Sequence, residues 1–262
     1  MTACKCFDQY HFQESPPEVE FHSEVQDIES DAWKRLLDLI EEAAKDQREE
    51  FDPGHEIGWE NWVQISTLPT TVSKLKSVKK LIVIGSNLVR IPPEIGEMTN
   101  LESFEAYMAY RIHWYPFEIT RCKNLVKSSA STRALYGNFK LRPPFPKLSP
   151  DITSTKGMDL DNLSPKIWGT EAVENCSVCN RTLKDTGLYQ AWITLRVATD
   201  DLPLLVNACS PECLRKLPQS ANSGYDYVKE AHKGGLEVKQ PPPYQRINFD
   251  SSEDNLSPPE AA

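Results

Sequence analysis

The cysteines are the residues of this sequence whose spacing best indicates chemistry. Cys176 and Cys179 form a CxxC pair, and Cys209 and Cys213 form a CxxxC pair separated from it by 29 residues. Four thiolates in two such pairs are a ligand set that Zn²⁺ takes in tetrahedral sites. Because cysteines four apart share one helix face, and a helix N-terminus favours thiolates, the second pair suits a helix start. We therefore expect a structural Zn²⁺, whose four sulfur ligands leave no open position for catalysis.

Two other interpretations of the four cysteines remain open. They can be reduced core or surface cysteines without a metal, or the CxxC pair can be a redox site. A thioredoxin-like site needs a strand before the motif and a helix that begins at it. The polar neighbours Asn175 and Asn180 do not supply that context.

The other three cysteines give weaker signals. Cys122 falls on an apolar position of a repeat and is expected to be a small buried hydrophobe. Cys4 and Cys6 lie in a polar N-terminal segment, where free thiols are favoured over an accessory metal or redox pair with His11. An odd number of cysteines argues against complete disulfide pairing.

Composition and charge limit the class of protein. The 262 residues carry a net charge of −9, yet residues 60–148 hold 13 basic and six acidic residues. A solvated lysine-rich surface is favoured over a site for an acidic partner. No run of 18 apolar residues exists, and the start lacks the basic and apolar regions of a secretory signal. We expect a cytoplasmic protein without a membrane segment.

The N-terminal part divides into an arm and a helix. Residues 1–29 are polar and contain Pro16-Pro17, which predicts a poorly ordered arm. Apolar residues then recur at helical spacing from Ser30, a good N-cap, to about Glu50. Asp52-Pro53-Gly54 is expected to end this helix. Trp59 and Trp62 are expected to pack in the cap.

Residues 60–148 contain a repeat with steps of 23 and then 24 residues. Four apolar positions recur in phase through three units: Leu68, Val72, Leu75 and Val78; Ile91, Ile95, Met98 and Leu101; and Tyr115, Ile119, Cys122 and Leu125. The first position of each unit is followed by proline. A unit of one strand and one returning segment buries its apolar edge only by stacking on its neighbours.

This pattern resembles the 23-residue leucine-rich repeat, LxxLxLxxNxLxxLPxxIxxLxx, which covers about a third of the chain. The central unit fits best, and Ser86 replaces the usual asparagine, with Asn87 one place later. The resemblance implies an α/β fold: a short repeat solenoid over residues 30–148, with the Ser30–Glu50 helix as its N-terminal cap.

The C-terminal part carries the cysteine pairs. We expect a linker over 149–170, a four-cysteine module over 171–218 and a flexible, proline-rich acidic tail over 219–262. Thr199-Asp200-Asp201 predicts a hairpin turn between two strands, and Ser210-Pro211 predicts a helix start. Knuckle, hairpin and helix resemble a treble-clef zinc finger, although the helical pair there usually has two intervening residues.

The sequence contains no catalytic constellation, and we expect a non-enzymatic protein. A partner-binding patch is expected on the concave repeat surface and its rim, because aromatic residues and arginine anchor interfaces. Its candidates are Tyr107, Tyr110, Arg111, His113, Trp114, Tyr115, Arg133 and Tyr136. The competing interpretation is that these aromatic residues cover the core of an irregular repeat.

A protein partner is therefore the leading functional hypothesis. The alternative is a nucleic-acid-binding or regulatory protein that acts through the treble-clef-like module. Residues 171–218 hold five basic and six acidic residues. Nucleic-acid binding requires a basic excess, so this alternative is disfavoured.

Overall fold

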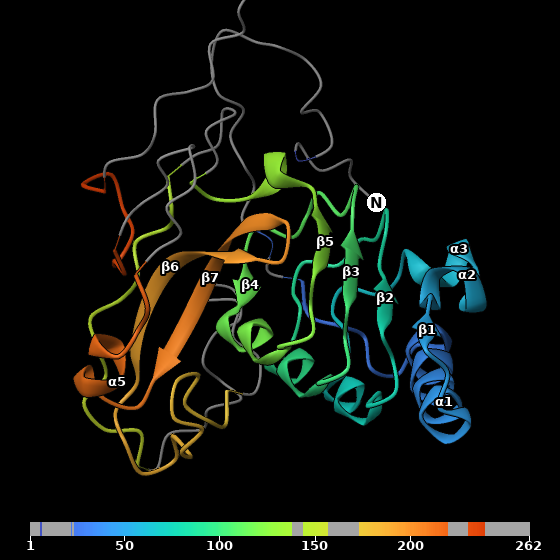
Figure 1. The fold of residues 1–262 in the computed structure, drawn as a ribbon, viewed down its shortest axis with the longest axis horizontal. Coiled ribbons are helices and arrows are strands. Elements are labelled where there is room, and N and C mark those ends of the chain that lie inside the picture. The colour runs from blue at the N-terminus through green and yellow to red at the C-terminus, as the bar shows by residue number, and fades with distance from the viewer. Residues whose placement is uncertain are drawn as a thin grey trace, which may run out of the picture.

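The computed structural model describes residues 6, 22, 24–137, 144–156, 173–219 and 230–238. The fold is α/β, with a four-stranded parallel sheet and a three-stranded mixed sheet (Figure 1). None of the described helices combines the length and the hydropathy needed to cross a membrane. The expected α/β class is therefore confirmed.

A helix covers one end of the parallel sheet. Helix α1 (Asp31–Asp46) begins where the sequence predicts, and the Ser30 hydroxyl accepts a hydrogen bond from the Trp33 N–H at 3.2 Å. It ends earlier than predicted, at Gln47 in the left-handed conformation. Asp52 caps α2 (Pro53–Ile57) instead of ending α1, because proline suits the first position of a helix. Helix α3 (Trp59–Trp62) follows.

The parallel sheet is built from regularly spaced strands. Its order is β1 (Glu50–Phe51), β2 (Lys80–Ile82), β3 (Ser103–Ala106) and β5 (Lys127–Ala130). Lys80 pairs with Ser103, and Ser103 pairs with Lys127. The returning segments are 3₁₀ helices η2 (Thr70–Lys74), η3 (Pro93–Glu97) and η4 (Phe117–Arg121), and η5 (Thr132–Ala134) follows β5. Strands β2, β3 and β5 and the 3₁₀ helices η2, η3 and η4 recur at steps of 23 and 24 residues, whereas β1 precedes β2 by 30 residues.

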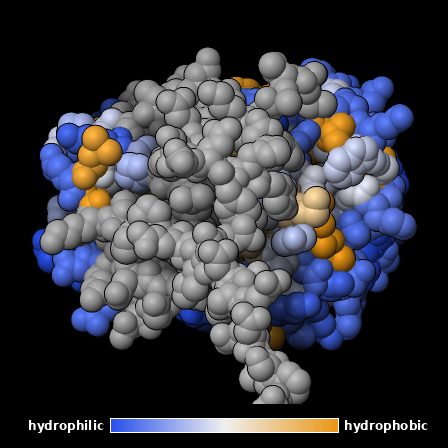
Figure 2. All heavy atoms as spheres, turned by 90° about the horizontal axis from the view of Figure 1, so that it is seen from above, coloured by the Kyte–Doolittle hydropathy of each residue, from blue (hydrophilic) through white to orange (hydrophobic). Residues whose placement is uncertain are grey.

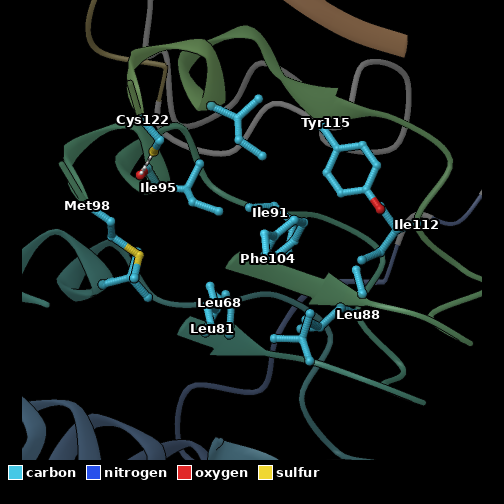
Figure 3. Packing of buried hydrophobic residues seen from close by; sticks show 14 of the residues in the cluster. Leu68, Leu81, Leu88, Ile91, Ile95, Met98, Phe104, Ile112, Tyr115 and Cys122 are labelled. Atoms are coloured by element: carbon cyan, nitrogen blue, oxygen red, sulfur yellow. Dashed lines mark hydrogen bonds between the residues drawn. The ribbon is translucent and has the colours of Figure 1, made fainter. Parts of the chain in front are cut away.

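The apolar repeat positions meet between the sheet and the 3₁₀ helices. Leu81 and Phe104 project from the strands toward Leu68, Ile91 and Ile95 (Figure 3). Cys122 is buried in the same layer, as predicted, and its thiol donates a hydrogen bond to the Ile95 carbonyl at 3.2 Å. Burial raises the pKa of this thiol to about 11. This layer is the core that the spacing of the apolar residues predicts.

The second sheet joins the two halves of the chain. A hairpin of β6 (Tyr189–Val197) and β7 (Asp200–Ala208) pairs through β7 with β4 (Tyr115–Pro116), which belongs to the repeat region. The hairpin turn is one residue earlier than predicted and has Ala198 at φ 53°. Helix α5 (Pro211–Arg215) begins at Ser210, as predicted. One hydrophobic core contains residues of the repeat and of the hairpin, so the two are not packed as separate modules.

Parts of the predicted arm, linker and tail are packed. Cys6, His22 and Gln26 are buried, and Thr155 of the predicted linker is fully buried. His232 of the predicted tail exchanges backbone hydrogen bonds with Trp192 of β6, at 2.9 and 2.8 Å. These residues of the expected arm, linker and tail are therefore packed against the fold. Cys4 and His11 lie outside the described residues.

Candidate metal centre

The four predicted cysteine ligands lie together beside the hairpin. The sulfur of Cys209 is 3.5 Å from that of Cys179 and 3.6 Å from that of Cys213. All four sulfurs, including that of Cys176, lie within 4.8 Å of one another. Sulfurs bound tetrahedrally to zinc at about 2.3 Å are separated by about 3.8 Å. The four cysteines can therefore hold a metal ion such as zinc.

A tight turn places the first pair. The Cys176 N–H donates to the Arg181 carbonyl at 2.8 Å, and the Cys176 carbonyl accepts from the Asn180 N–H at 2.9 Å. Asn180 has a positive φ of 59°, which asparagine tolerates better than most residues. The N–H groups of Cys179 and Cys209 point at the Cys176 sulfur, at 3.5 and 3.3 Å. Such donors stabilise a thiolate.

The end of β7 and the start of α5 place the second pair. Cys209 follows the strand directly, and the Ser210 hydroxyl accepts from the Cys213 N–H at 3.3 Å. This cap fixes the first turn of the helix and brings the two sulfurs together. The extra residue in CSPEC, relative to the treble-clef pattern, therefore does not separate the ligands.

Without a metal, the pKa values of Cys179 and Cys209 are shifted in opposite directions. Burial raises the pKa of Cys209 to about 12. Burial also acts to raise the pKa of Cys179, but hydrogen bonds from the Arg181 backbone and from the neighbouring thiols outweigh it and bring this pKa to about 7. Four thiolates together require a cation, because their charges repel one another in a partly buried site.

The predicted aromatic patch is mostly buried. Tyr107 is 53% exposed and Arg111 is partly buried, whereas the side chain of Arg133 lies outside the described part of the structure. The other five candidates are buried: Tyr110, His113, Trp114, Tyr115 and Tyr136. These five side chains cannot form an open binding surface, and the interpretation that they cover the core is the better one.

The hairpin contributes to the burial of Trp114, Tyr115 and Tyr136. Trp114 stacks on Tyr136 with ring centres 5.8 Å apart, and Trp192 of β6 lies 5.7 Å from Trp114. Tyr115 lies edge-on to Phe104 at 5.8 Å. Trp192 lies far away in sequence, and no repeat pattern indicates that a later strand covers these rings.

Three exposed apolar side chains, those of Ile84, Tyr107 and Met108, lie past the carboxyl ends of β2 and β3. Ile84 is 41% exposed, and Met108 follows the exposed Tyr107. The hydrogen bond from the Gly85 N–H to the Tyr107 carbonyl, at 2.9 Å, continues the ladder between these strands. A Cβ added at Gly85 would lie 3.7 Å from the Trp59 ring, so the ring lies beside this glycine. Trp59 is 60% exposed, so only Trp62 of the two predicted cap tryptophans is buried. We name Trp59, Ile84, Tyr107 and Met108 the rim patch.

Comparison with known proteins adds no relative to this picture. No protein-family model matches the chain, and a search of curated proteins finds no similar one.

Proposed function

We propose that this chain is a short leucine-rich repeat protein that binds a protein partner without catalysis. The partner would dock on the face of the parallel sheet and on the rim patch. A structural Zn²⁺ at the four-cysteine centre would hold the hairpin. The observation that carries the proposal is the pair of exposed apolar side chains, Ile84 and Tyr107, side by side at the ends of two neighbouring strands.

Side-chain amides support the repeat assignment. Asn100 donates to the Lys76 carbonyl at 2.8 Å, and Asn124 donates to the Thr99 carbonyl at 3.0 Å. Each therefore reaches from its own unit to the preceding one. Asn87, next to the usual asparagine position, likewise donates to the Val63 carbonyl at 2.9 Å. Repeated contacts between nearest neighbours are what stabilises a solenoid.

The sheet face supplies polar groups next to the rim patch. Lys80 and Lys127 lie on either side of the partly buried Glu105, with nitrogen–oxygen distances of 3.9 and 3.4 Å. Small groups of hydrophobic residues on an otherwise hydrophilic surface are visible in Figure 2. An apolar centre with a polar rim is the usual composition of a protein–protein interface. The partner segment therefore needs apolar side chains that contact Ile84 and Tyr107.

The all-cysteine ligand set supports a structural rather than a catalytic metal. Four thiolates fill a tetrahedral zinc ion, so no position remains for water or substrate. The centre lies where the first turn of α5 meets the end of β7. A metal there would hold the CxxC turn against the hairpin.

The test compares single substitutions at the two ends of the sheet. Immobilised wild-type chain, Ile84→Ser, Tyr107→Ser and Val126→Ser are incubated with lysate of the source cells, and captured proteins are quantified. Val126 is 71% exposed and lies at the opposite strand ends, which makes it a control for loss of an apolar side chain. We expect a protein whose capture falls about tenfold or more in the first two variants and is unchanged in the third.

Purified partner titrated against the same four chains then gives the affinities. Equal capture by all four chains overturns the rim patch as the docking site. Loss in all three variants alike would indicate nonspecific hydrophobic retention, which also overturns it.

A further inference from the structure

A second group of metal-ligating side chains lies away from the four-cysteine centre. Cys6 and His22 come from the predicted arm, and His113 comes from the segment between β3 and β4. The Cys6 sulfur is 3.4 Å from Nε2 of His22 and 3.4 Å from Nε2 of His113. The two imidazole rings are nearly parallel, with centres 5.7 Å apart. All three side chains are buried.

Hydrogen bonds on the far side of each ring orient the two histidines. Nδ1 of His113 contacts the carbonyl oxygen of Ala134, which can only accept a hydrogen bond. Nδ1 therefore carries the hydrogen, and the Nε2 lone pair faces the Cys6 sulfur. Metal-binding histidines usually donate their other N–H to a carbonyl or carboxylate in this way.

His22 has the same arrangement with a carboxylate. Its Nδ1 is 3.1 Å from Oε1 of Glu24, and the Arg111 guanidinium lies 3.0 Å from the same nitrogen. Arg111 also donates to the Glu24 carboxylate. An unprotonated Nδ1 would place its lone pair against the carboxylate oxygen. The Arg111 N–H, in contrast, can donate only to an unprotonated Nδ1. A metal bound at Nε2 would select the tautomer with hydrogen on Nδ1, in which Nδ1 donates to Glu24.

The distances between these groups fit a cation. Without a cation, the thiol can donate to Nε2 of only one histidine, and the other contact requires hydrogen on the second Nε2. A metal ion accepts the thiolate and both Nε2 lone pairs together. With bonds of about 2.3 Å to sulfur and 2.0–2.1 Å to nitrogen, a tetrahedral zinc site separates the two ligand atoms by about 3.5 Å. The two distances of 3.4 Å match this separation.

We propose that Cys6, His22 and His113 bind a second Zn²⁺, which fastens the N-terminal arm to the repeat. One thiolate and two imidazoles suit zinc, whereas Mg²⁺ and Ca²⁺ prefer oxygen ligands. Both histidines bind as neutral rings, so uptake of Zn²⁺ releases the one proton of the Cys6 thiol. A nucleophilic role suits Cys6 less well, because its side chain is 1% exposed. The site stands independently of the proposed partner-binding function.

Contacts next to the three proposed ligands also hold this part of the arm against the repeat region. Gln26 accepts a hydrogen bond from the Ser66 N–H at 2.8 Å. Arg90 donates to the Glu24 carbonyl, and Arg111 pairs with the Glu24 carboxylate. These contacts hold the segment from His22 to Gln26 along successive turns of the repeat. His22 is therefore positioned by its neighbours before a metal binds.

Zinc content of the full-length chain tests the site. The wild type, Cys6→Ser, His22→Gln and Cys122→Ser are purified without chelator, dialysed against metal-free buffer and assayed for zinc per chain. We expect Cys6→Ser and His22→Gln to hold one ion fewer than the wild type, and Cys122→Ser, a buried cysteine elsewhere in the core, to equal it. Equal zinc in all four chains overturns the site.

A Cys176→Ser/Cys209→Ser variant separates this proposal from the four-cysteine centre. If the second site exists, this variant keeps one ion, and that ion is lost when Cys6→Ser is added. Complete loss of zinc from the double variant, while its circular dichroism remains that of the folded chain, overturns the second site.

X-ray absorption spectroscopy at the zinc edge tests the site in the wild-type chain, so the result does not depend on the folding of a variant. The proposal predicts a nitrogen shell at about 2.0 Å in addition to the sulfur shell at about 2.3 Å. A shell of sulfur alone overturns it.

Discussion

Pro116 of β4 and Leu205 of β7 are partners in a parallel strand pair. This pair connects a repeat unit to the hairpin that leads to two of the four cysteines. Trp114 and Trp192 pack across the same junction. The four-cysteine centre therefore lies at the end of β7, and the same hairpin packs into the core of the repeat region.

If the four-cysteine centre holds zinc, as proposed, loss of that zinc should destabilise the whole fold, not the hairpin alone. Cys209→Ser/Cys213→Ser is expected to lower the free energy of unfolding by several kcal/mol and the Tm by on the order of 10 °C, because structural zinc contributes directly to folding. Thermal unfolding followed by circular dichroism should show one transition at the lower Tm. Cys122→Ser is the control, since it removes a core thiol and leaves the centre intact. Two separate transitions, with the upper one at the wild-type Tm, would contradict the shared core.

Gly96 should be intolerant of a side chain. A Cβ added there would lie 2.5 Å from the Glu118 carbonyl oxygen, closer than van der Waals contact allows. We expect Gly96→Ala to destabilise the chain by about 1–3 kcal/mol, because η3 and η4 must move apart. Urea unfolding measures the difference. Ser73 occupies the equivalent place in η2, and Ser73→Ala should change stability little. Equal stability of the two variants would disprove the close approach.

The periodicity of the apolar residues predicts which residues are buried in the repeat region. A residue such as Leu81 or Ile95 is buried by its own unit and the next one, so the contacts are local and repeat along the chain. The same holds for the cysteines, where CxxC and a capped helix start fix each pair locally. Sequence spacing is informative where the partners lie within one or two repeats.

Long-range packing accounts for what the sequence does not predict. Trp114 and Tyr136 resemble interface anchors by type and position, but the later hairpin covers them. His22 lies in a polar segment without a recognisable motif, and its neighbour His113 is far along the chain. Nothing in either local sequence indicates that they meet. The rim patch was not predicted because Ile84 occupies a variable position of the repeat, where the motif specifies neither residue type nor exposure.

The charged form of the buried Glu118 carboxyl should lower the free energy of unfolding at neutral pH. Its side chain is buried and Oε2 has no hydrogen-bond partner among the described residues, and burial raises the pKa of this carboxyl above 4.5. Because the folded-state pKa is raised, the protonated form is favoured in the fold. The cost of the charged form is therefore absent below the unfolded value and grows as the pH rises toward the folded-state pKa.

Glu118→Gln should consequently be more stable than the wild type by about 1–3 kcal/mol at pH 7. The difference should vanish near pH 4. Urea unfolding at both pH values measures it. Glu102→Gln removes the same charge from an exposed position and should leave stability nearly unchanged. A destabilised Glu118→Gln at pH 7 would show that the charge has a favourable partner.

His232 should make the fold sensitive to mild acid. Burial lowers the pKa of His232 to about 4, from 6.5. Its Nδ1 accepts a hydrogen bond from the Gly234 N–H at 3.0 Å, and its ring lies edge-on to Phe145, with ring centres 4.6 Å apart. Protonation of the ring would break that hydrogen bond and place a charge among aromatic residues. The neutral ring is therefore the form that the fold selects.

The sign of the pH dependence follows from this lowered pKa. The unfolded chain takes up a proton near pH 6.5, whereas the folded chain does so only near pH 4. The contribution of neutral His232 is therefore complete above pH 6.5 and is lost as the pH falls toward 4. We expect about 1–2 kcal/mol in total, since the ring is partly open to solvent.

The comparison of wild type with His232→Asn at several pH values between 7.5 and 4 isolates this contribution. Asparagine keeps an acceptor for the Gly234 N–H but does not titrate. The stability of the wild type should fall more steeply with acid than that of the variant, and His55→Gln, at an exposed histidine, should follow the wild type. Parallel curves for the wild type and His232→Asn would mean that His232 does not couple protonation to folding.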